Sequence, residues 1–378
     1  MKTDLVKGFK DYTGEEAIKR AEVRKIIIDN FERYGFEPAE TPIVEYEDFV
    51  KGENQNDEAV SDIFKLKDKG ERALALRYEF TFQLKRLMQN KKLPYKRYQI
   101  GEVFRDEPVS ANRFRQFVQC DIDTIGSTIK DEAEVLSLVS DVMKQLKIKP
   151  EILINNRKLI NEILNYEKIK DKDKIQVLRE IDKYDKLPEK ELKDNLKKYG
   201  ADKILDDMKK GEKFFNKFDS YKEILELINL CKNYGLKIMF SPTIVRGLSY
   251  YNSSVFEIKA EGIKETIAAG GSYMFNGIQC TGLAFGLDRL SIISQINSSK
   301  ERLLIISLGQ DKESIKLAQK LRIEGKSVIV YYGKPSKALE YANSYNIQNV
   351  IFIGEKEIKS KKFKIKDLKT GKEKELKI

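Results

Sequence analysis

The sequence predicts an α+β fold, in which an antiparallel sheet flanked by helices is interrupted by a helical insertion and followed by a C-terminal α/β domain. Three observations support this prediction. Residues 101–123 contain two strand patterns joined by a short loop. Residues 150–236 are rich in Lys, Asp and Glu and have mostly helical patterns. Residues 302–354 alternate strand and helix patterns in βαβαβ order.

The first part of the chain, residues 1–149, is expected to mix helices and strands. A capping box at Thr13–Glu16 predicts a helix start, and Gly35 predicts its end. Prolines within residues 35–45 favour an extended edge segment. The elements expected next are a hairpin of residues 63–67 and 73–77, a helix over 79–90, the strand pair within 101–123 and a helix over 131–146.

The rest of the chain is expected to form three further parts. Residues 150–236 are the helical insertion, and residues 237–296 return to strand and turn patterns before a polar linker near 295–299. Residues 301–378 form the βαβαβ domain, and its last 16 residues, FKIKDLKTGKEKELKI, are typical of a final hairpin.

Composition limits the chemistry of this 378-residue chain, because it contains no histidine. Histidine-dependent catalysis and histidine metal sites are therefore excluded. The three cysteines are isolated in the sequence, which suits a reducing compartment and has no zinc pattern. No long uncharged apolar run is present, so we expect no membrane association and a cytoplasmic protein.

The net charge of +11 is unevenly distributed. Residues 301–378 contain 18 Lys and Arg against 10 Asp and Glu, so this part carries +8. A concentrated basic surface favours a polyanionic partner, most simply a nucleic acid. The alternative is a lysine-rich proteome in which every protein is basic.

The returning strand of the pair within 101–123 carries a row of polar and aromatic side chains. Alternation places these residues on one face: Arg113, Arg115, Phe117, Gln119, Asp121 and Asp123. Such a row can bind phosphate, stack on a base and hold a polar ligand. The alternative is a solvated sheet face with paired charges.

Further segments carry polar groups at turns. Glu79 and Thr81 follow a strand, where Glu79 could accept a ligand ammonium or cap its own helix. Arg246 precedes a glycine and the pair Tyr250-Tyr251, and this segment could bind an anion or be an ordinary loop. Two segments remain. AGGSY (269–273) contains a glycine pair that could approach a ligand closely or form a turn. GLAFGLDRL (282–290) contains an arginine that could reach a phosphate or lie on a helix surface.

No glycine-rich phosphate loop of the GxxxxGK or GxGxxG kind is present. A bound nucleotide would therefore be held by arginines on an antiparallel sheet. Taken together, the segments resemble the core of class II aminoacyl-tRNA synthetases. Pro42 matches motif 1, the group of Arg105, Glu107 and Phe117 matches motif 2, and Arg289 matches motif 3.

The resemblance becomes specific in two segments, FRDE…RFRQFVQCDID and VRGLSYYNSSVFE, which are similar to the histidyl-tRNA synthetase family. It covers nearly the whole chain in the order of that family. It implies a class II antiparallel catalytic core formed by residues 1–149 and 237–296. It also implies that residues 301–378 are an anticodon-binding domain.

The resemblance also implies site residues and ligands. The catalytic arginines would be Arg105, Arg246 and Arg289. The histidine site would comprise Glu79, Phe80, Thr81, Arg105, Gln119, Asp123, Arg246, Tyr250, Tyr251 and Tyr273. The ATP site would comprise Arg105, Glu107, Arg113, Phe117 and Arg289. The implied ligands and partners are ATP, Mg²⁺ without an assigned protein ligand, histidine, the histidine-specific tRNA and a second copy of the chain.

The implied activity is that of a histidine–tRNA ligase, which activates histidine with ATP and then loads it onto the 3′ end of tRNA. Positioned guanidinium groups can perform adenylation without a proton-transferring histidine. Two alternatives remain open from the sequence. One is an inactive paralogue that senses histidine as a regulatory subunit, and the other is a tRNA-binding module without activity.

Overall fold

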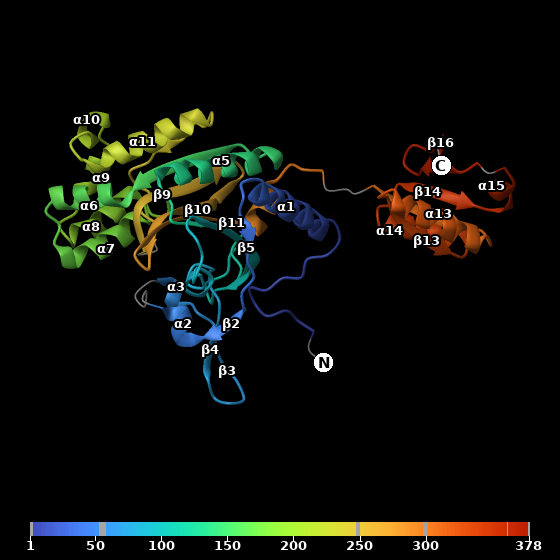
Figure 1. Cartoon of the computed structure of the whole chain (residues 1–378), viewed down its shortest axis with the longest axis horizontal. Coiled ribbons are helices and arrows are strands. Elements are labelled where there is room, and N and C mark those ends of the chain that lie inside the picture. The colour runs from blue at the N-terminus through green and yellow to red at the C-terminus, as the bar shows by residue number, and fades with distance from the viewer. Residues whose placement is uncertain (1–2, 53–57, 247–249, 298–300, 361, 377–378) are drawn as a thin grey trace. The chain divides into compact units, whose positions relative to one another are not determined.

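The computed structural model describes residues 3–52, 58–246, 250–297, 301–360 and 362–376. The contacts divide the chain into two compact units, residues 1–297 and 298–378 (Figure 1). In the described part of the chain, no helix combines the length and the apolar character needed to cross a membrane.

An eight-stranded sheet forms the centre of the first unit, and its strand order is β1-β5-β6-β11-β10-β9-β7-β8. All inner pairings are antiparallel, whereas the edge strands β1 and β8 run parallel to their neighbours. The bounds are β1 (Glu37–Pro38), β5 (Tyr95–Phe104), β6 (Gln116–Ile125), β11 (Ile278–Gly286), β10 (Ile263–Phe275), β9 (Tyr251–Ala260), β7 (Pro150–Asn156) and β8 (Met239–Phe240). The predicted α+β fold class is confirmed.

Buried side chains of α1 (Gly14–Arg33), α5 (Ile129–Gln145) and α12 (Leu287–Ile293) pack with the sheet in the main core of this unit. Helix α5 begins with a capping box formed by Thr128 and Asp131. The capping box predicted for α1 is wrong, because the Thr13 side chain makes no capping hydrogen bond. Glu16 instead forms an exposed ion pair with Lys10 at 2.6 Å.

The segment between the two halves of the sheet begins with strand β7 and continues as helices. Strand β7 pairs with β9, so the sheet extends into residues 150–156. The helices are α6 (Arg157–Tyr166), α7 (Asp171–Ile181), α8 (Glu189–Lys197), α9 (Ile204–Met208), α10 (Glu212–Phe215) and α11 (Ser220–Asn233). Their buried side chains belong to the same core as the sheet, and Figure 1 shows α11 lying along α5.

A small three-stranded sheet of order β2-β4-β3 lies within the same unit. The predicted hairpin is confirmed as the antiparallel pair β3–β4. The predicted helix over 79–90 is mostly wrong, because only Leu84–Leu87 is helical. Residues 77–80 and 82–84 are all buried, so this stretch has no solvent-facing side that an amphipathic helix needs. The bounds are β2 (Val44–Tyr46), α2 (Glu47–Lys51), α3 (Glu58–Ser61), β3 (Lys65–Lys67), β4 (Ala73–Leu76) and α4 (Leu84–Leu87).

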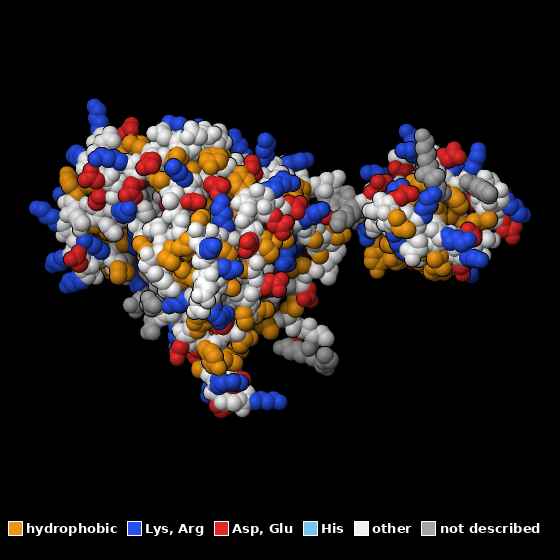
Figure 2. All heavy atoms as spheres, viewed as in Figure 1, with side chains coloured by type: hydrophobic (Ala, Val, Ile, Leu, Met, Phe, Trp, Pro, Cys, Tyr) orange, Lys and Arg blue, Asp and Glu red, His pale blue; other side chains and the backbone are white. Residues whose placement is uncertain are grey.

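The second unit has the predicted βαβαβ order and the predicted final hairpin. Its sheet has the strand order β13-β12-β14-β15-β16, with β12, β13 and β14 parallel and β15–β16 antiparallel. Figure 2 shows basic and acidic side chains interspersed over the visible face of this unit. The bounds are β12 (Arg302–Ser307), α13 (Asp311–Ile323), β13 (Ser327–Tyr332), α14 (Pro335–Ser344), β14 (Asn349–Ile353), α15 (Glu355–Ser360), β15 (Lys364–Asp367) and β16 (Glu373–Glu375).

Candidate functional site

A cavity lies over the middle of the large sheet. On β6, Val118 and Cys120 point into the main core, whereas Gln119 and Asp121 point into the cavity, as strand alternation requires. The cavity also receives the loop after β4 and the segment before β9. Its lining comprises Glu79, Thr81, Arg105, Gln119, Asp121, Ile122, Asp123, Arg246, Tyr250, Tyr251, Ala269, Tyr273, Gly282, Leu283 and Ala284.

This cavity brings together nine of the ten residues predicted for the amino-acid site. The exception is Phe80, whose side chain is fully buried outside the lining. The guanidinium carbon of Arg77 lies 4.8 Å from the centre of the Phe80 ring, so this ring packs in the interior. Gly247–Ser249, the middle of the predicted RGLSYY motif, lies outside the described residues.

Three tyrosines form one wall of the cavity. The Tyr250 ring lies 4.8 Å from the Tyr251 ring and 5.4 Å from the Tyr273 ring, measured between centroids. The Tyr250 hydroxyl donates to Glu79 Oε2 at 3.4 Å. This wall therefore combines apolar ring faces with a carboxylate, which suits a ligand that has a flat ring and an ammonium group.

Acidic groups on β6 form the floor of the cavity. Asp123 forms an ion pair with Arg97, with 2.6 Å between Oδ2 and Nη2, and it also accepts a hydrogen bond from the Tyr273 hydroxyl. Burial raises the pKa of Asp123, and the charge of Arg97 opposes that rise. Gly282 of the neighbouring strand leaves room for this arrangement, because a Cβ atom there would overlap Asp123 Oδ1.

The sequence placed Asp121 in the polar row of this strand but assigned neither Asp121 nor Arg97 to the histidine or ATP site. Asp121 lines the cavity and its Oδ1 accepts from Gln119 Nε2 at 3.2 Å. Arg97 is fully buried, and it lies directly opposite Asp123 in the register of β5 and β6. The available signal was that register, because opposite charges on facing strand positions form cross-strand pairs.

The arginines predicted for the nucleotide are grouped beside the cavity. Arg105 donates to the Tyr78 carbonyl at 3.1 Å and to Gln119 Oε1 at 3.4 Å, and its guanidinium carbon lies 5.2 Å from the Phe117 ring centre. Arg113 is half exposed and pairs with the buried carboxylate of Glu107. This group therefore offers positive charge and an aromatic face at the cavity rim.

Arg289 belongs to the same group. Its Nη1 donates to the Thr266 carbonyl at 2.6 Å. Burial lowers the pKa of Arg289, and the nearby charges of Arg113 and Arg105 lower it further, whereas Glu265 and Glu107 raise it. Guanidinium groups that lie close together repel one another. An anion such as a polyphosphate that binds among them offsets this repulsion.

Arg246 lines the cavity in a backbone conformation that is uncommon for a side-chain-bearing residue, with a φ of 55°. Arg157 supports this segment from α6, since its Nη1 donates to the Val245 carbonyl at 2.8 Å and to the Arg246 carbonyl at 3.5 Å. Left-handed residues persist where the surroundings hold them and are concentrated at functional sites.

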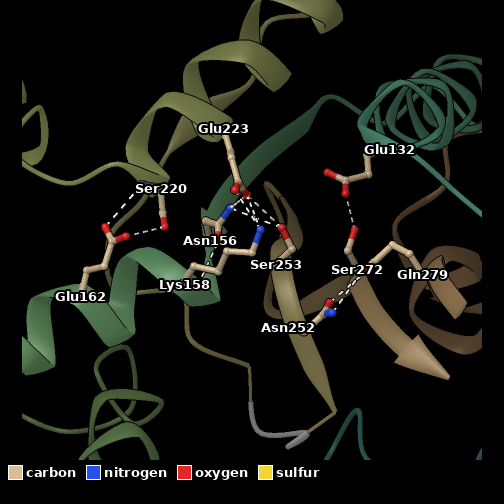
Figure 3. Close-up of polar contacts among 10 residues, drawn as sticks. All are labelled: Glu132, Asn156, Lys158, Glu162, Ser220, Glu223, Asn252, Ser253, Ser272 and Gln279. Carbon is tan, nitrogen blue, oxygen red and sulfur yellow. Dashed lines mark hydrogen bonds and ion pairs between the residues drawn. The ribbon is translucent and has the colours of Figure 1, made fainter. Parts of the chain in front are cut away.

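Polar contacts join the cavity strands to the helices behind them (Figure 3). Ser272, next to Tyr273, donates from β10 to Glu132 of α5. Glu223 of α11 accepts from Asn156 at 2.8 Å and from Ser253 of β9 at 3.1 Å. The strands that carry Tyr251 and Tyr273 are therefore tied to α5 and α11 through buried or half-buried hydrogen bonds.

In the described ranges, no group of three or more Cys, Asp or Glu side chains is arranged to hold a metal ion. Magnesium in nucleotide sites usually needs only one or two carboxylates together with phosphate oxygens. Glu107 and Glu265, whose charges act on Arg289, are carboxylates that fit this requirement.

Comparisons with known proteins point to one family. Residues 8–290 match the family model described as histidyl-tRNA synthetase, and residues 302–378 match the anticodon binding domain model. The chain is 34% identical over 410 residues to a protein of Bacillus anthracis named histidine–tRNA ligase 1, covering 97% of this chain and 96% of that protein.

Two solved structures share the fold. A histidyl-tRNA synthetase from Nostoc sp. PCC 7120 has a TM-score of 0.86 at 24% identity and covers 100% of this chain and 97% of its own. An ATP phosphoribosyltransferase regulatory subunit/histidyl-tRNA synthetase from Bacillus halodurans C has a TM-score of 0.78 at 19% identity, covering 93% and 98%. Because both kinds of protein share this fold, the fold alone does not separate a ligase from a regulatory relative.

Proposed function

The chain belongs to the histidyl-tRNA synthetase family, and from this premise we propose that it converts histidine and ATP to histidyl-adenylate and pyrophosphate and then transfers histidine to tRNA. Its nearly full-length similarity to named histidine–tRNA ligases makes it an aminoacyl-tRNA synthetase. The two chemical steps, the ligand positions and the partners are the proposal.

The observation that carries the proposal is the placement of acidic and basic side chains along the lining of one cavity. Glu79 and Thr81 lie on the lining where they can accept the α-ammonium of an amino acid. Arg105 and Arg246 lie on the same lining and can bind its carboxylate. Asp123 can accept a hydrogen bond from a ring N–H, and a site built on such polar pairs rejects rings without the N–H.

In the first step, a carboxylate oxygen of histidine attacks the α-phosphorus of ATP. The new O–P bond forms as the bond between the α-phosphorus and the bridging oxygen breaks, and pyrophosphate leaves with that electron pair. Negative charge builds up on the α-phosphate oxygens during this displacement. Guanidinium groups at fixed positions beside the cavity stabilise that charge, and no protein group needs to move a proton.

Each member of the arginine group has a proposed task. Arg105 and Arg246 contact the reacting carboxylate and the α-phosphate, because both line the cavity. Arg289 binds the outer phosphates, supported by its position beside Arg105 and Arg113. Phe117 stacks on the adenine, and Glu107 and Arg113 hold the rest of the nucleotide.

Mg²⁺ supplies further positive charge to the phosphates when it is bound. Glu107 and Glu265 are the residues that would hold it, together with phosphate oxygens. In the second step, a terminal ribose hydroxyl of tRNA attacks the histidyl carbonyl carbon. AMP leaves, and a phosphate oxygen of the adenylate takes the hydroxyl proton.

The proposed partners follow from both units. Residues 302–378 match an anticodon binding domain, and we assign them to the tRNA. A second copy of the chain would pair along the edge segment that contains Pro42, and the protein would act in the cytoplasm.

The test is ATP–pyrophosphate exchange with each amino acid in turn. Exchange with histidine alone, followed by loading of histidine onto tRNA, is the expected result. Arg289→Met is the matched variant, because it would remove the proposed contact to the outer phosphates without changing a residue of the cavity lining. The absence of exchange with every amino acid would contradict the proposal and favour a regulatory histidine-binding or tRNA-binding protein, which direct histidine and tRNA titrations would then separate.

A further inference from the structure

We propose that Arg97 is a positioning residue of the histidine site, which holds the Asp123 carboxylate ionised and aimed at the substrate ring. This inference rests on the proposed function. It concerns a residue outside the cavity lining that reaches the site through its ion pair with Asp123.

The geometry of Arg97 singles it out. Its side chain has no exposed surface, and it is the largest side chain of the described residues to be fully buried. A buried guanidinium needs a counter-charge, because removing an ion from water costs several kcal/mol. Asp123 provides that charge at 2.6 Å, from the facing position of the next strand.

The same nitrogen makes a second contact. Arg97 Nη2 also donates to the Phe80 carbonyl at 3.3 Å, between the two cavity residues Glu79 and Thr81. One guanidinium therefore connects the strand that would meet the ring of histidine with the loop that would meet its ammonium. Among the described residues, the Nε and Nη1 atoms of Arg97 have no hydrogen-bond partner, so these two contacts are its anchors.

Asp123 needs such a partner to accept a hydrogen bond from the substrate. Burial favours the protonated carboxyl group, which would lose acceptor capacity at the proton-bearing oxygen. Arg97 opposes protonation, and the Tyr273 hydroxyl fixes the other oxygen. Each carboxylate oxygen has two acceptor positions, so capacity for a ring N–H remains after both contacts.

A second carboxylate makes Arg97 more important. Asp121 lies two residues before Asp123 and also lines the cavity. Burial and the charges of Asp123 and Glu79 raise the pKa of Asp121 well above its ordinary range, and the charge of Arg97 opposes that rise. Without Arg97, the two buried carboxylates would have only Arg105 and Arg246 as cations on the lining, so protonation of Asp123 would be favoured as well.

The test is a double-mutant cycle on the full chain, with histidine and ATP titrated separately by calorimetry. The variants are R97M, D123N, R97M/D123N and the conservative R97K. We expect R97M and D123N each to weaken histidine binding at least about 10-fold while ATP binding stays within about 3-fold. The double variant should be no weaker than the weaker single variant, because both substitutions remove one shared contact.

R97K should restore most of the histidine affinity, because it returns the positive charge beside Asp123. R77M is the matched control: Arg77 is also buried, but its Nε and Nη1 donate to the carbonyls of Glu102 and Thr41, at 2.7 and 2.8 Å. We expect R77M to lower stability without changing histidine affinity. If R97M does not fold, R97M/D123N is compared with D123N, since the neutral pair leaves no buried charge unmatched.

Four results would overturn the inference: unchanged histidine affinity in folded R97M, additive losses in the double variant, parallel loss of ATP binding, or, where R97M does not fold, a double variant clearly weaker than D123N. A wild-type chain that binds ATP but not histidine would instead contradict the proposed function itself. The two failures are therefore distinguishable.

Discussion

Asp288 and Arg20 form a largely buried ion pair, with 2.6 Å between Oδ1 and Nη1, that joins α12 to α1. The other oxygen of Asp288 accepts from the Val118 backbone N–H at 3.0 Å, on the strand that carries Gln119. Asp288 immediately precedes Arg289. One carboxylate therefore holds the segment of Arg289, the arginine proposed to bind the outer phosphates, in a fixed relation to the first helix and to the floor of the cavity.

Replacing Asp288 by alanine should damage both stability and nucleotide binding. The change leaves Arg20 and the Val118 N–H without this partner, and breaking a buried pair in this way costs about 2–4 kcal/mol. We expect a lower free energy of unfolding in urea and a higher KM for ATP in pyrophosphate exchange, with the KM for histidine less affected. Glu16→Gln is the control, because its pair with Lys10 is exposed and should contribute under about 1 kcal/mol. Equal effects of the two substitutions would refute this role of Asp288.

Replacing Arg246 by alanine should slow catalysis far more than it weakens binding. If Arg246 stabilises the charge that builds up on the α-phosphate, its removal should lower kcat of exchange about 10²–10³-fold. Histidine binding, measured by calorimetry, should weaken much less than this, because Arg105 also lies on the lining and can bind the carboxylate. The unfolding midpoint should change little. Wild-type turnover in this variant would contradict the assigned role.

Replacing Gly282 by alanine should weaken histidine binding by displacing Asp123. A Cβ atom at this position would overlap Asp123 Oδ1 and lie 3.2 Å from the Ile122 carbonyl, so the carboxylate has to move. We expect at least about 10-fold weaker histidine binding and about 1–3 kcal/mol lower stability. Gly211→Ala is the matched control, because an added Cβ there meets no atom within 4 Å. Histidine affinity that is equal in both variants would show that the Asp123 position does not matter.

Replacing Glu132 by glutamine should change the pH dependence of stability. Burial raises the pKa of Glu132, so between the unfolded and folded pKa values the folded state binds more protons than the unfolded state. The contribution of Glu132 to stability is therefore greatest below the unfolded value, near 4.5, and falls as pH rises toward the folded value. Glutamine cannot ionise, so the Tm of the variant minus that of the wild type should become more positive between pH 4 and pH 7. A difference that stays constant with pH would refute the shift.

Ending the chain at Asn297 should separate the two proposed steps. Residues 1–297 form one compact unit and contain the whole cavity lining. We expect pyrophosphate exchange within about 10-fold of the full chain, and a much larger loss of tRNA loading, because the removed residues 298–378 carry +9 of the net charge. Loading that stays in step with exchange would show that the second unit does not contribute to tRNA recognition.

The strands, and the face of a strand on which its polar residues lie, could be predicted from local sequence pattern. Alternation along β6 separated Val118 from Gln119 correctly, because successive side chains of a strand point to opposite faces. The βαβαβ order and the final hairpin were also correct. These features depend on residues that are close together in the chain, so they can be predicted without knowledge of the tertiary structure.

Local pattern failed where burial comes from distant segments. Of the helix predicted over 79–90, only Leu84–Leu87 is helical. The residues before Leu84 are enclosed by other parts of the fold. Phe80 is an interior ring for the same reason. Arg97 had no local signal at all, since its meaning depends on the strand that faces it.

The sequence by itself determined the kinds of chemistry open to this protein. It supplies arginines and carboxylates, without histidine, at alternating positions along strands. Only the tertiary structure decided which carboxylate is paired, which arginine is buried beneath the cavity and which lies on its lining. The physical reason is that charge depends on surroundings. Burial and counter-charges set the state of Asp121 and Asp123, and those surroundings come from strands far apart in the chain.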